Sequence, residues 1–192
     1  MANINGIEIK AVKTFLGMEG YARQGNVYMD NKKIGFYSED GDGGCSWIDF
    51  ACNKEIKTLF YDKVRSHFRK NPVPDHIIIY NMTLEEYAQN ENNLPVMKYE
   101  QESKETVMEY FMEELLDLRE LEQDYKKAVK KGYSAIVAVN YTSLSGNPLP
   151  LNEVYFTNGT QGSIDKVKSV AKKKSIAVTV KAYISPVDFK IM

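Results

Sequence analysis

Apolar and polar residues alternate along the first part of the chain, which is the pattern of half-buried β-strands. The alternation begins at residues 7–11 and returns at 27–29 and 34–36, on either side of a short polar turn. Two such segments around a polar turn predict a hairpin. A further apolar segment at 47–50 follows a glycine-rich stretch, so we expect an antiparallel sheet within residues 1–52.

The period then changes to that of a helix. Apolar residues recur at steps of three and four from Ile56 to Phe68, and Pro72 ends this pattern. The β-branched run 76–80 fits a buried strand. Thr83 to Glu86 has the spacing of a capping box, which predicts the start of a short helix.

The longest predicted element is a helix of about 29 residues, between Ser103 as a suitable N-cap and Gly132 as a suitable C-terminal glycine. One apolar stripe runs along it. Its members are Val107, Tyr110, Phe111, Leu115, Leu118, Leu121, Tyr125, Ala128 and Val129. The helix is therefore amphipathic, and we expect this stripe to pack in the core.

The rest of the chain reads as strand, strand, helix and strand, over residues 135–141, 153–157, 163–174 and 176–184, with Ser163 as the helix N-cap. The predicted fold class is α+β, with an N-terminal antiparallel sheet, a long amphipathic helix and a C-terminal ββαβ unit. Composition changes suggest a β-sheet subdomain, a helical middle with one strand and a C-terminal α/β subdomain, at residues 1–52, 53–132 and 133–192. We expect these to form one compact body.

Charge is distributed unevenly along the chain. The formal net charge of the 192 residues is −1, yet residues 85–124 hold thirteen acidic and three basic side chains. Residues 126–192 hold eleven lysines and three acidic residues. This asymmetry predicts interactions with charged partners.

The long helix carries an acidic stripe on the side opposite its apolar stripe. Its six carboxylates recur every three or four residues, at Glu105, Glu109, Glu113, Asp117, Glu120 and Asp124. Few basic residues lie one turn away to neutralise them. We expect these six residues to bind a partner, such as a basic channel that normally holds nucleic acid; a merely solvated helix face is the alternative.

The residues that could support catalysis by a nucleophile are few. Cys45 and Cys52 form neither a disulfide framework nor a zinc site, and we expect buried free thiols. His67 and His76 lie on an apolar helix face and at the start of a predicted strand, so structural roles are expected. No catalytic residue, metal ligand or cofactor is predicted.

A metal-dependent nuclease acting on RNA is the enzymatic alternative, because such a site needs only two or three carboxylates brought together by the fold. The candidates are Glu39, Asp40, Asp42 and Asp49. The glycine-rich stretch that contains three of them lacks an EF-hand or phosphate-binding pattern, which favours a simple turn.

Neither a secretory signal pattern nor an apolar run of about 20 residues is present, so we expect a protein of the host-cell cytoplasm that does not span a membrane. Basic residues at 54–70 and in the last third of the chain could contact nucleic acid directly, but the chain is nearly neutral and carries no recognised nucleic-acid motif. A solvated basic face is the simpler interpretation.

The first fifty residues also carry a resemblance, in the segments Asn3-Ile4-Asn5-Gly6-Ile7-Glu8-Ile9-Lys10, Gly25-Asn26-Val27-Tyr28-Met29-Asp30, Lys33-Ile34-Gly35 and Asp40-Gly41-Asp42-Gly43-Gly44. This part resembles small accessory proteins of phages and plasmids of Gram-positive bacteria. Such proteins include inhibitors of host defence, among them type II-A anti-CRISPR proteins that act on Cas9 or its guide RNA. The resemblance transfers no functional residue.

Taken together, these features lead to three hypotheses. The first is a mobile-element accessory protein that inhibits a bacterial defence nuclease of the CRISPR-Cas type by binding through its acidic stripe. Its partner would be a host defence protein or ribonucleoprotein, with nucleic acid as a possible component. The second is the nuclease described above, and the third is a phage structural or housekeeping protein whose charge separation serves self-association.

Overall fold

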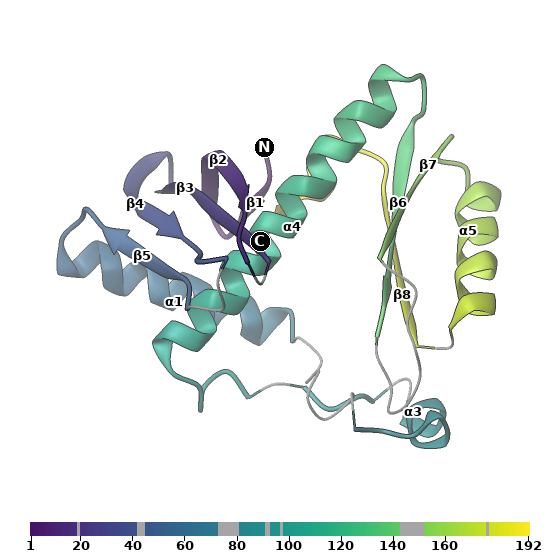
Figure 1. The fold of residues 1–192 in the computed structure, drawn as a ribbon, viewed down its shortest axis with the longest axis horizontal. Coiled ribbons are helices and arrows are strands. Elements are labelled where there is room, and N and C mark those ends of the chain that lie inside the picture. Colours follow the sequence, from purple (N-terminus) through teal and green to yellow (C-terminus); the bar gives the residue numbers. More distant parts are fainter. Residues whose placement is uncertain are drawn as a thin grey trace. The chain divides into compact units, whose positions relative to one another are not determined.

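The computed structural model describes residues 1–18, 20–41, 45–72, 81–90, 93–96, 98–142, 152–175 and 177–192. The protein is α+β, with the antiparallel N-terminal sheet, the long helix and the C-terminal ββαβ unit that the sequence predicts (Figure 1). The chain divides into two compact units. The first comprises Met1–Asn71, Lys98–Glu120 and Phe189–Met192, and the second comprises Pro72–Met97 and Leu121–Asp188. Each unit therefore combines segments that are distant in sequence.

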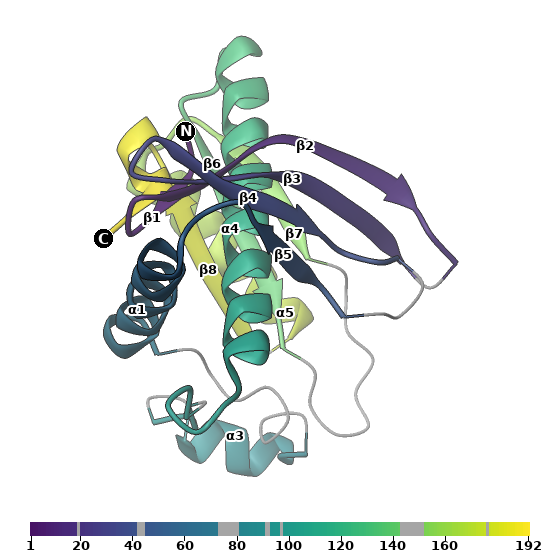
Figure 2. The same ribbon diagram turned by 90° about the vertical axis from the view of Figure 1, so that its left-hand side faces the viewer.

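The first unit contains a six-stranded sheet with the order β5-β4-β3-β2-β1-β9. The strands are β1 (Asn3–Ile4), β2 (Ile7–Leu16), β3 (Tyr21–Met29), β4 (Lys32–Ser38), β5 (Trp47–Phe50) and β9 (Lys190–Ile191). Strands β2 to β5 follow one another as antiparallel neighbours (Figure 2). The predicted hairpin and the predicted strand after the glycine-rich stretch are confirmed.

Two-residue turns connect the early strands. Asn5 and Gly6 join β1 to β2 with φ of 50° and 82°, and Asp30 and Asn31 join β3 to β4 with φ of 49° and 66°. Asparagine, aspartate and glycine tolerate positive φ at two successive positions, which a tight hairpin turn requires. The local sequence therefore sets the register of both connections.

The last strand, β9, was not predicted. It runs parallel to β1, with Asn3 opposite Lys190 and Ile4 opposite Ile191. The backbone amide of Asn5 also donates to the carbonyl of Ile191 at 2.8 Å. This pairing joins the two ends of the described chain and explains why Phe189–Met192 belongs to the first unit.

Helix α1 (Lys54–Lys70) and the first part of α4 (Lys104–Lys130) belong to the first unit and cover one face of its sheet. Aromatic contacts connect the three elements: the Phe50 ring of β5 lies 5.3 Å from Phe60 of α1, which lies 6.2 Å from Phe111 of α4, measured between centroids. Ile9 and Tyr37 on the same sheet face are almost fully buried. This face is the inner face of the sheet.

Both predicted ends of the long helix are confirmed. The Ser103 hydroxyl accepts from the amide of Thr106 at 3.1 Å, and Gly132 has a φ of 86°. The amide of Tyr133 donates to the carbonyl of Ala128, and that of Gly132 to Val129, both at 3.0 Å, which is a Schellman motif. The helix thus has 27 residues rather than about 29.

The second unit contains α3 (Leu84–Asn90), β6 (Ala135–Tyr141), β7 (Glu153–Thr157), α5 (Gln161–Lys174), β8 (Val178–Tyr183) and the 3-10 helix Pro186–Phe189, whose last residue falls in the first unit. The sheet order is β7-β6-β8, all antiparallel. Val137, Val139 and Tyr141 of the central strand pack with Val167 and Ala171 of α5. The predicted capping box is present, since Thr83 and Glu86 exchange backbone–side-chain hydrogen bonds.

One cap was predicted wrongly. Thr160, not Ser163, is the N-cap of α5, and its hydroxyl accepts from the amide of Ser163. The predicted strand 76–80 lies outside the described residues, as do residues 42–44 of the glycine-rich stretch. Within the described part of the chain, every helix is too short or too polar to cross a membrane.

Candidate functional site

The acidic stripe predicted on the long helix lies mostly in the first unit. Glu105, Glu113, Asp117 and Glu120 are exposed and Glu109 is half-buried. Asp124 belongs to the second unit, where its carboxylate lies 2.8 Å from Nζ of Lys127. We refer to the five carboxylates of the first unit, Glu105, Glu109, Glu113, Asp117 and Glu120, as the acidic face.

Opposite the acidic face, the same helix is buried. Val107, Phe111 and Leu115 have no exposed surface, and Leu118 retains 3%. Met108, Met112 and Leu116 are also buried, so the buried arc is wider than the predicted stripe. The acidic residues therefore occupy the side that packing leaves to solvent.

Arg23 of β3 contacts the acidic face. Its side chain is 16% exposed, and its guanidinium binds Glu39 at two points, with Nε 2.6 Å from Oε2 and Nη2 3.2 Å from Oε1. Its Nη1 lies 3.8 Å from Oδ1 of Asp117, whose side chain is 71% exposed. The hydrogen bond with Glu39 raises the pKa of Arg23 above its usual value, against the effect of burial. Arg23 is thus paired mainly with Glu39.

The carboxylates of the acidic face repel one another. Partial loss of surrounding water raises the pKa of both Glu113 and Asp117 above the usual range. Arg23 opposes this shift in both residues, whereas neighbouring carboxylates add to it: Glu109 and Asp117 act on Glu113, and Glu120 acts on Asp117. Like charges therefore lie close enough on this face to act on one another.

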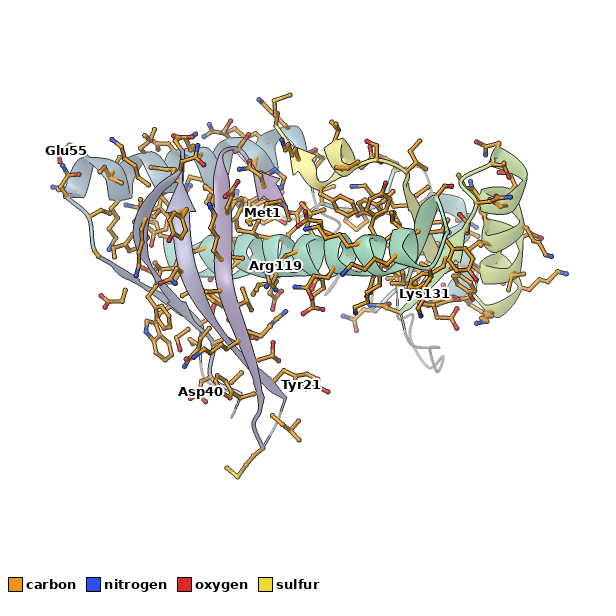
Figure 3. The ribbon with its side chains drawn as sticks, turned by 90° about the horizontal axis from the view of Figure 1, so that it is seen from above. Met1, Tyr21, Asp40, Glu55, Arg119 and Lys131 are labelled. Carbon is orange, nitrogen blue, oxygen red and sulfur yellow. The ribbon has the colours of Figure 1, made fainter. Side chains whose placement is uncertain are left out.

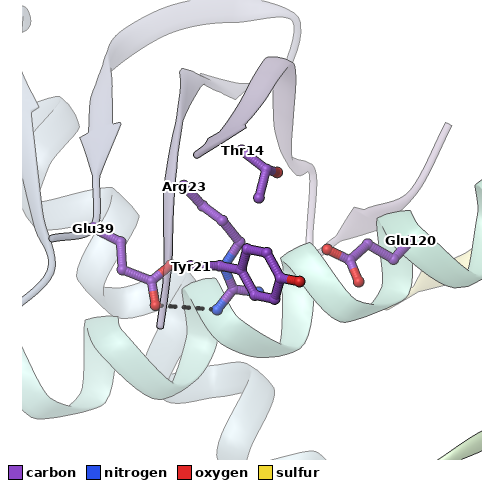
Figure 4. Close-up of a pocket in the computed structure, with 5 residues that line it drawn as sticks. All are labelled: Thr14, Tyr21, Arg23, Glu39 and Glu120. Atoms are coloured by element: carbon purple, nitrogen blue, oxygen red, sulfur yellow. Dashed lines mark hydrogen bonds and ion pairs between the residues drawn. The ribbon is translucent and has the colours of Figure 1, made fainter. Parts of the chain in front are cut away.

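A pocket of about 410 Å³ lies where β2 ends and β3 begins. It is lined by Thr14, Tyr21, Arg23, Glu39 and Glu120. Arg23 and Tyr21 lie between Glu39 on one side and Glu120 of α4 on the other (Figure 4). Tyr21 and Asp40 mark the same end of the sheet in Figure 3. Glu120 belongs to both the pocket lining and the acidic face, so the two surfaces adjoin.

His67 has the structural role that the sequence indicated. Its ring is fully buried, with Nε2 2.8 Å from Oε2 of Glu114 and Nδ1 3.3 Å from Nδ2 of Asn71. The cysteines are free, but the expectation of burial is wrong: Cys45 is exposed and Cys52 half-buried. Cys45 precedes and Cys52 follows β5, a short strand at the edge of the sheet. His76 lies outside the described residues.

The carboxylates proposed for a metal-dependent nuclease do not converge in the part of the chain that the structure describes. Glu39 is bound to Arg23, whereas Asp49 lies on β5 and is exposed. Asp42 falls outside the described residues. Among described residues, no group of three or more histidine, cysteine, aspartate or glutamate side chains is arranged to hold a metal ion.

The second unit contains a polar cluster that sequence reasoning missed. The Glu153 carboxylate accepts from the Tyr141 hydroxyl at 2.9 Å, from the Tyr155 hydroxyl and from the Lys174 ammonium. These hydrogen bonds, above all that from Lys174, lower the pKa of Glu153 to about 2. The alternation of Glu153 and Tyr155 on one strand face was the available signal, but it does not identify Tyr141 and Lys174. The cluster ties β6, β7 and α5 together.

Comparisons with known proteins add no further guidance on the site. No family model, no curated protein and no solved structure matches the chain.

Proposed function

We propose that this is a binding protein that presents its acidic face to a basic surface of a partner, and that the partner is a bacterial defence nuclease. The observation that carries the binding role is the row of like charges along one side of α4. Four of its five carboxylates are exposed, and Arg23, which contacts Asp117 at 3.8 Å, is already paired with Glu39. Carboxylates that lie close together at a surface and raise one another's pKa are typical of functional sites.

The spacing of the charges supports a basic partner that normally holds nucleic acid. Glu105 to Glu120 span about 22 Å at 1.5 Å per residue, so the carboxylates recur about every 6 Å. Phosphates recur about every 3.4 Å along one strand of a duplex. The linear charge density is thus of the same order, and a lysine- and arginine-lined channel would attract both surfaces.

The choice of a CRISPR-Cas nuclease rests on the resemblance of the first fifty residues to accessory proteins of phages and plasmids. Binding in the nucleic-acid channel of such an enzyme would compete with target DNA. Inhibition would then need no catalytic residue in this protein. Electrostatic attraction would mainly increase the association rate, which salt would reduce.

The test is DNA cleavage by a purified type II-A effector nuclease loaded with guide RNA, with increasing amounts of this protein. We expect inhibition that weakens as salt increases. Glu113→Lys with Asp117→Lys should slow association by about tenfold or more at low salt. A matched pair on α1, Glu55→Lys with Asp62→Lys, makes the same charge change at exposed positions and should behave as wild type.

Two outcomes would contradict the proposal. Undiminished cleavage at saturating protein would remove the nuclease as the target, and equal loss in both double variants would remove the acidic face as the contact. RNA cleavage by the protein alone that EDTA abolishes would instead support the metal-dependent nuclease.

A further inference from the structure

The outer face of the N-terminal sheet carries exposed aromatic side chains. Successive residues of a strand point to opposite faces. On β4, Tyr37 is fully buried on the inner face, whereas Phe36 is 39% exposed. On β5, the Phe50 ring contacts Phe60 of α1, whereas Trp47 is 50% exposed. Figure 2 shows these strands in front of α4, with their other face toward the viewer.

The strand register arranges these rings along a diagonal. Phe36 lies opposite Asn26 of β3 and Asp49 of β5. Tyr28 is two residues beyond Asn26 on its strand, and Trp47 is two residues from Asp49 on its own. Phe36 and Trp47 are diagonal neighbours, which lie about 7–8 Å apart in a regular sheet. Tyr28 lies on the other side of Phe36, beyond a register shift between Val27 and Tyr28. Tyr28, Phe36 and Trp47 thus form an aromatic track across β3, β4 and β5.

Basic and amide side chains border the track. Lys13 lies opposite Gln24, and Lys33 lies opposite Tyr28. Nζ of Lys10 lies 4.5 Å from the centroid of the Tyr28 ring and 2.8 Å from Oε2 of Glu8. The amide of Gln24 donates to the Ser38 hydroxyl at 3.2 Å. The border therefore offers Lys13 and Lys33 at its margin, beside the Lys10–Glu8 ion pair and the Asp49 carboxylate, and hydrogen-bonding groups between the rings.

We propose that this outer face binds single-stranded RNA, independently of the acidic face. Aromatic side chains on neighbouring strands stack unpaired bases, and lysines beside them contact phosphates. The amide of Asn26, beside Phe36, supplies a donor and an acceptor for a base edge or a 2′-hydroxyl group. A duplex presents no free base faces, so it cannot use the track.

Other partners fit this surface less well. The rings are separated by amides and charges, so they do not form the continuous apolar patch that a stable protein interface buries at its centre. Insertion into a membrane would bury the Asp49 carboxylate next to Phe36, which is costly. A single strand, by contrast, needs rings at intervals and cations at the margin.

The experiment uses the intrinsic fluorescence of Trp47, the only tryptophan in the chain. A 12-nucleotide single-stranded RNA should quench this emission. When the same RNA carries a fluorescent label, its anisotropy should increase on binding, and the two titrations should give the same dissociation constant. Phe36→Ala should weaken binding by at least about fivefold, since one stacked base contributes roughly 1–3 kcal/mol. Lys13→Gln should weaken binding and reduce its salt dependence.

Tyr21→Ala is the matched control. Tyr21 belongs to the same sheet and is 65% exposed, but it lines the pocket on the inner face. This variant should bind RNA as wild type does. The proposal would be overturned by an absence of quenching or by an equal loss of RNA binding in Tyr21→Ala. It would also be overturned by tighter binding to duplex RNA or to single-stranded DNA of the same sequence. A dimer that Phe36→Ala dissociates would instead assign the face to a second copy of the chain.

Discussion

Arg23 and Asp117 approach within 3.8 Å although 93 residues separate them in sequence. The contact is long because the guanidinium already binds Glu39 through Nε and Nη2. Arg23 therefore reduces the repulsion among the carboxylates of α4 without cancelling it. This incomplete compensation leads to the first prediction.

Neutralising the acidic face should stabilise the protein at neutral pH. The pKa of Glu113 and of Asp117 is raised on folding. Such a carboxylate stabilises the fold at a pH below its unfolded pKa, and this stabilisation is lost as the pH increases through the folded pKa. Glu113→Gln with Asp117→Asn should increase the thermal midpoint by about 1–2 °C at pH 7 and low salt. Scans at increasing salt should reduce this difference. A lower midpoint in the double variant would show that the carboxylates stabilise the fold.

The buried side of α4 should be sensitive to truncation. Leu118 is 3% exposed, so Leu118→Ala removes packed methyl groups and should lower the free energy of unfolding by about 2–5 kcal/mol. Val129→Ala on the same helix is the control, because Val129 is 48% exposed. Its effect should stay within about 0.5 kcal/mol. Urea denaturation followed by circular dichroism measures both, and similar losses would mean that burial is not what distinguishes the two sites.

The glycine at the end of α4 should be required for its backbone conformation. Gly132 has a φ of 86° and no heavy atom within 4 Å of the position a Cβ would take. Gly132→Ala should therefore destabilise by about 1–2 kcal/mol through backbone strain alone. Gly162 of α5 has equally open surroundings but no positive φ, so Gly162→Ala should be neutral or stabilise by about 0.5 kcal/mol. Chemical denaturation of both variants separates strain from crowding.

The Glu153 cluster should make the stability of the second unit depend on pH in acid. The pKa of Glu153 is lowered to about 2, so its contribution is present above the unfolded value near 4.5 and is lost as pH falls toward 2. Carboxyl carbon shifts in an NMR titration should show this low midpoint. Lys174→Gln should raise the midpoint because it removes the main hydrogen-bond donor, whereas Lys173→Gln should leave it unchanged. A Glu153 midpoint near 4.5 in the wild type would contradict the cluster.

Local signals were sufficient to predict most of the elements. The turn residues Asp30 and Asn31 tolerate positive φ. The Ser103 and Gly132 ends of α4 and the Thr83 capping box satisfy hydrogen-bonding needs within a few residues. Such interactions depend on neighbours in sequence, so a pattern along the chain contains them. The same holds for the side of α4 that carries the carboxylates, because helical period alone separates it from the apolar stripe.

Tertiary structure decided everything that depends on residues distant in sequence. Pairing of β9 with β1 joins positions 3 and 190, and no local pattern specifies that choice. The predicted N-cap of α5, Ser163, was wrong, since Thr160 caps the helix. The contact of Arg23 with Asp117 exists only because α4 packs against β3, and the diagonal of Tyr28, Phe36 and Trp47 exists only because β3, β4 and β5 become neighbours. The sequence by itself determined which segments form helices and strands and which faces are charged, whereas packing determined which of those faces meet, since burial of the apolar faces selects one arrangement among many.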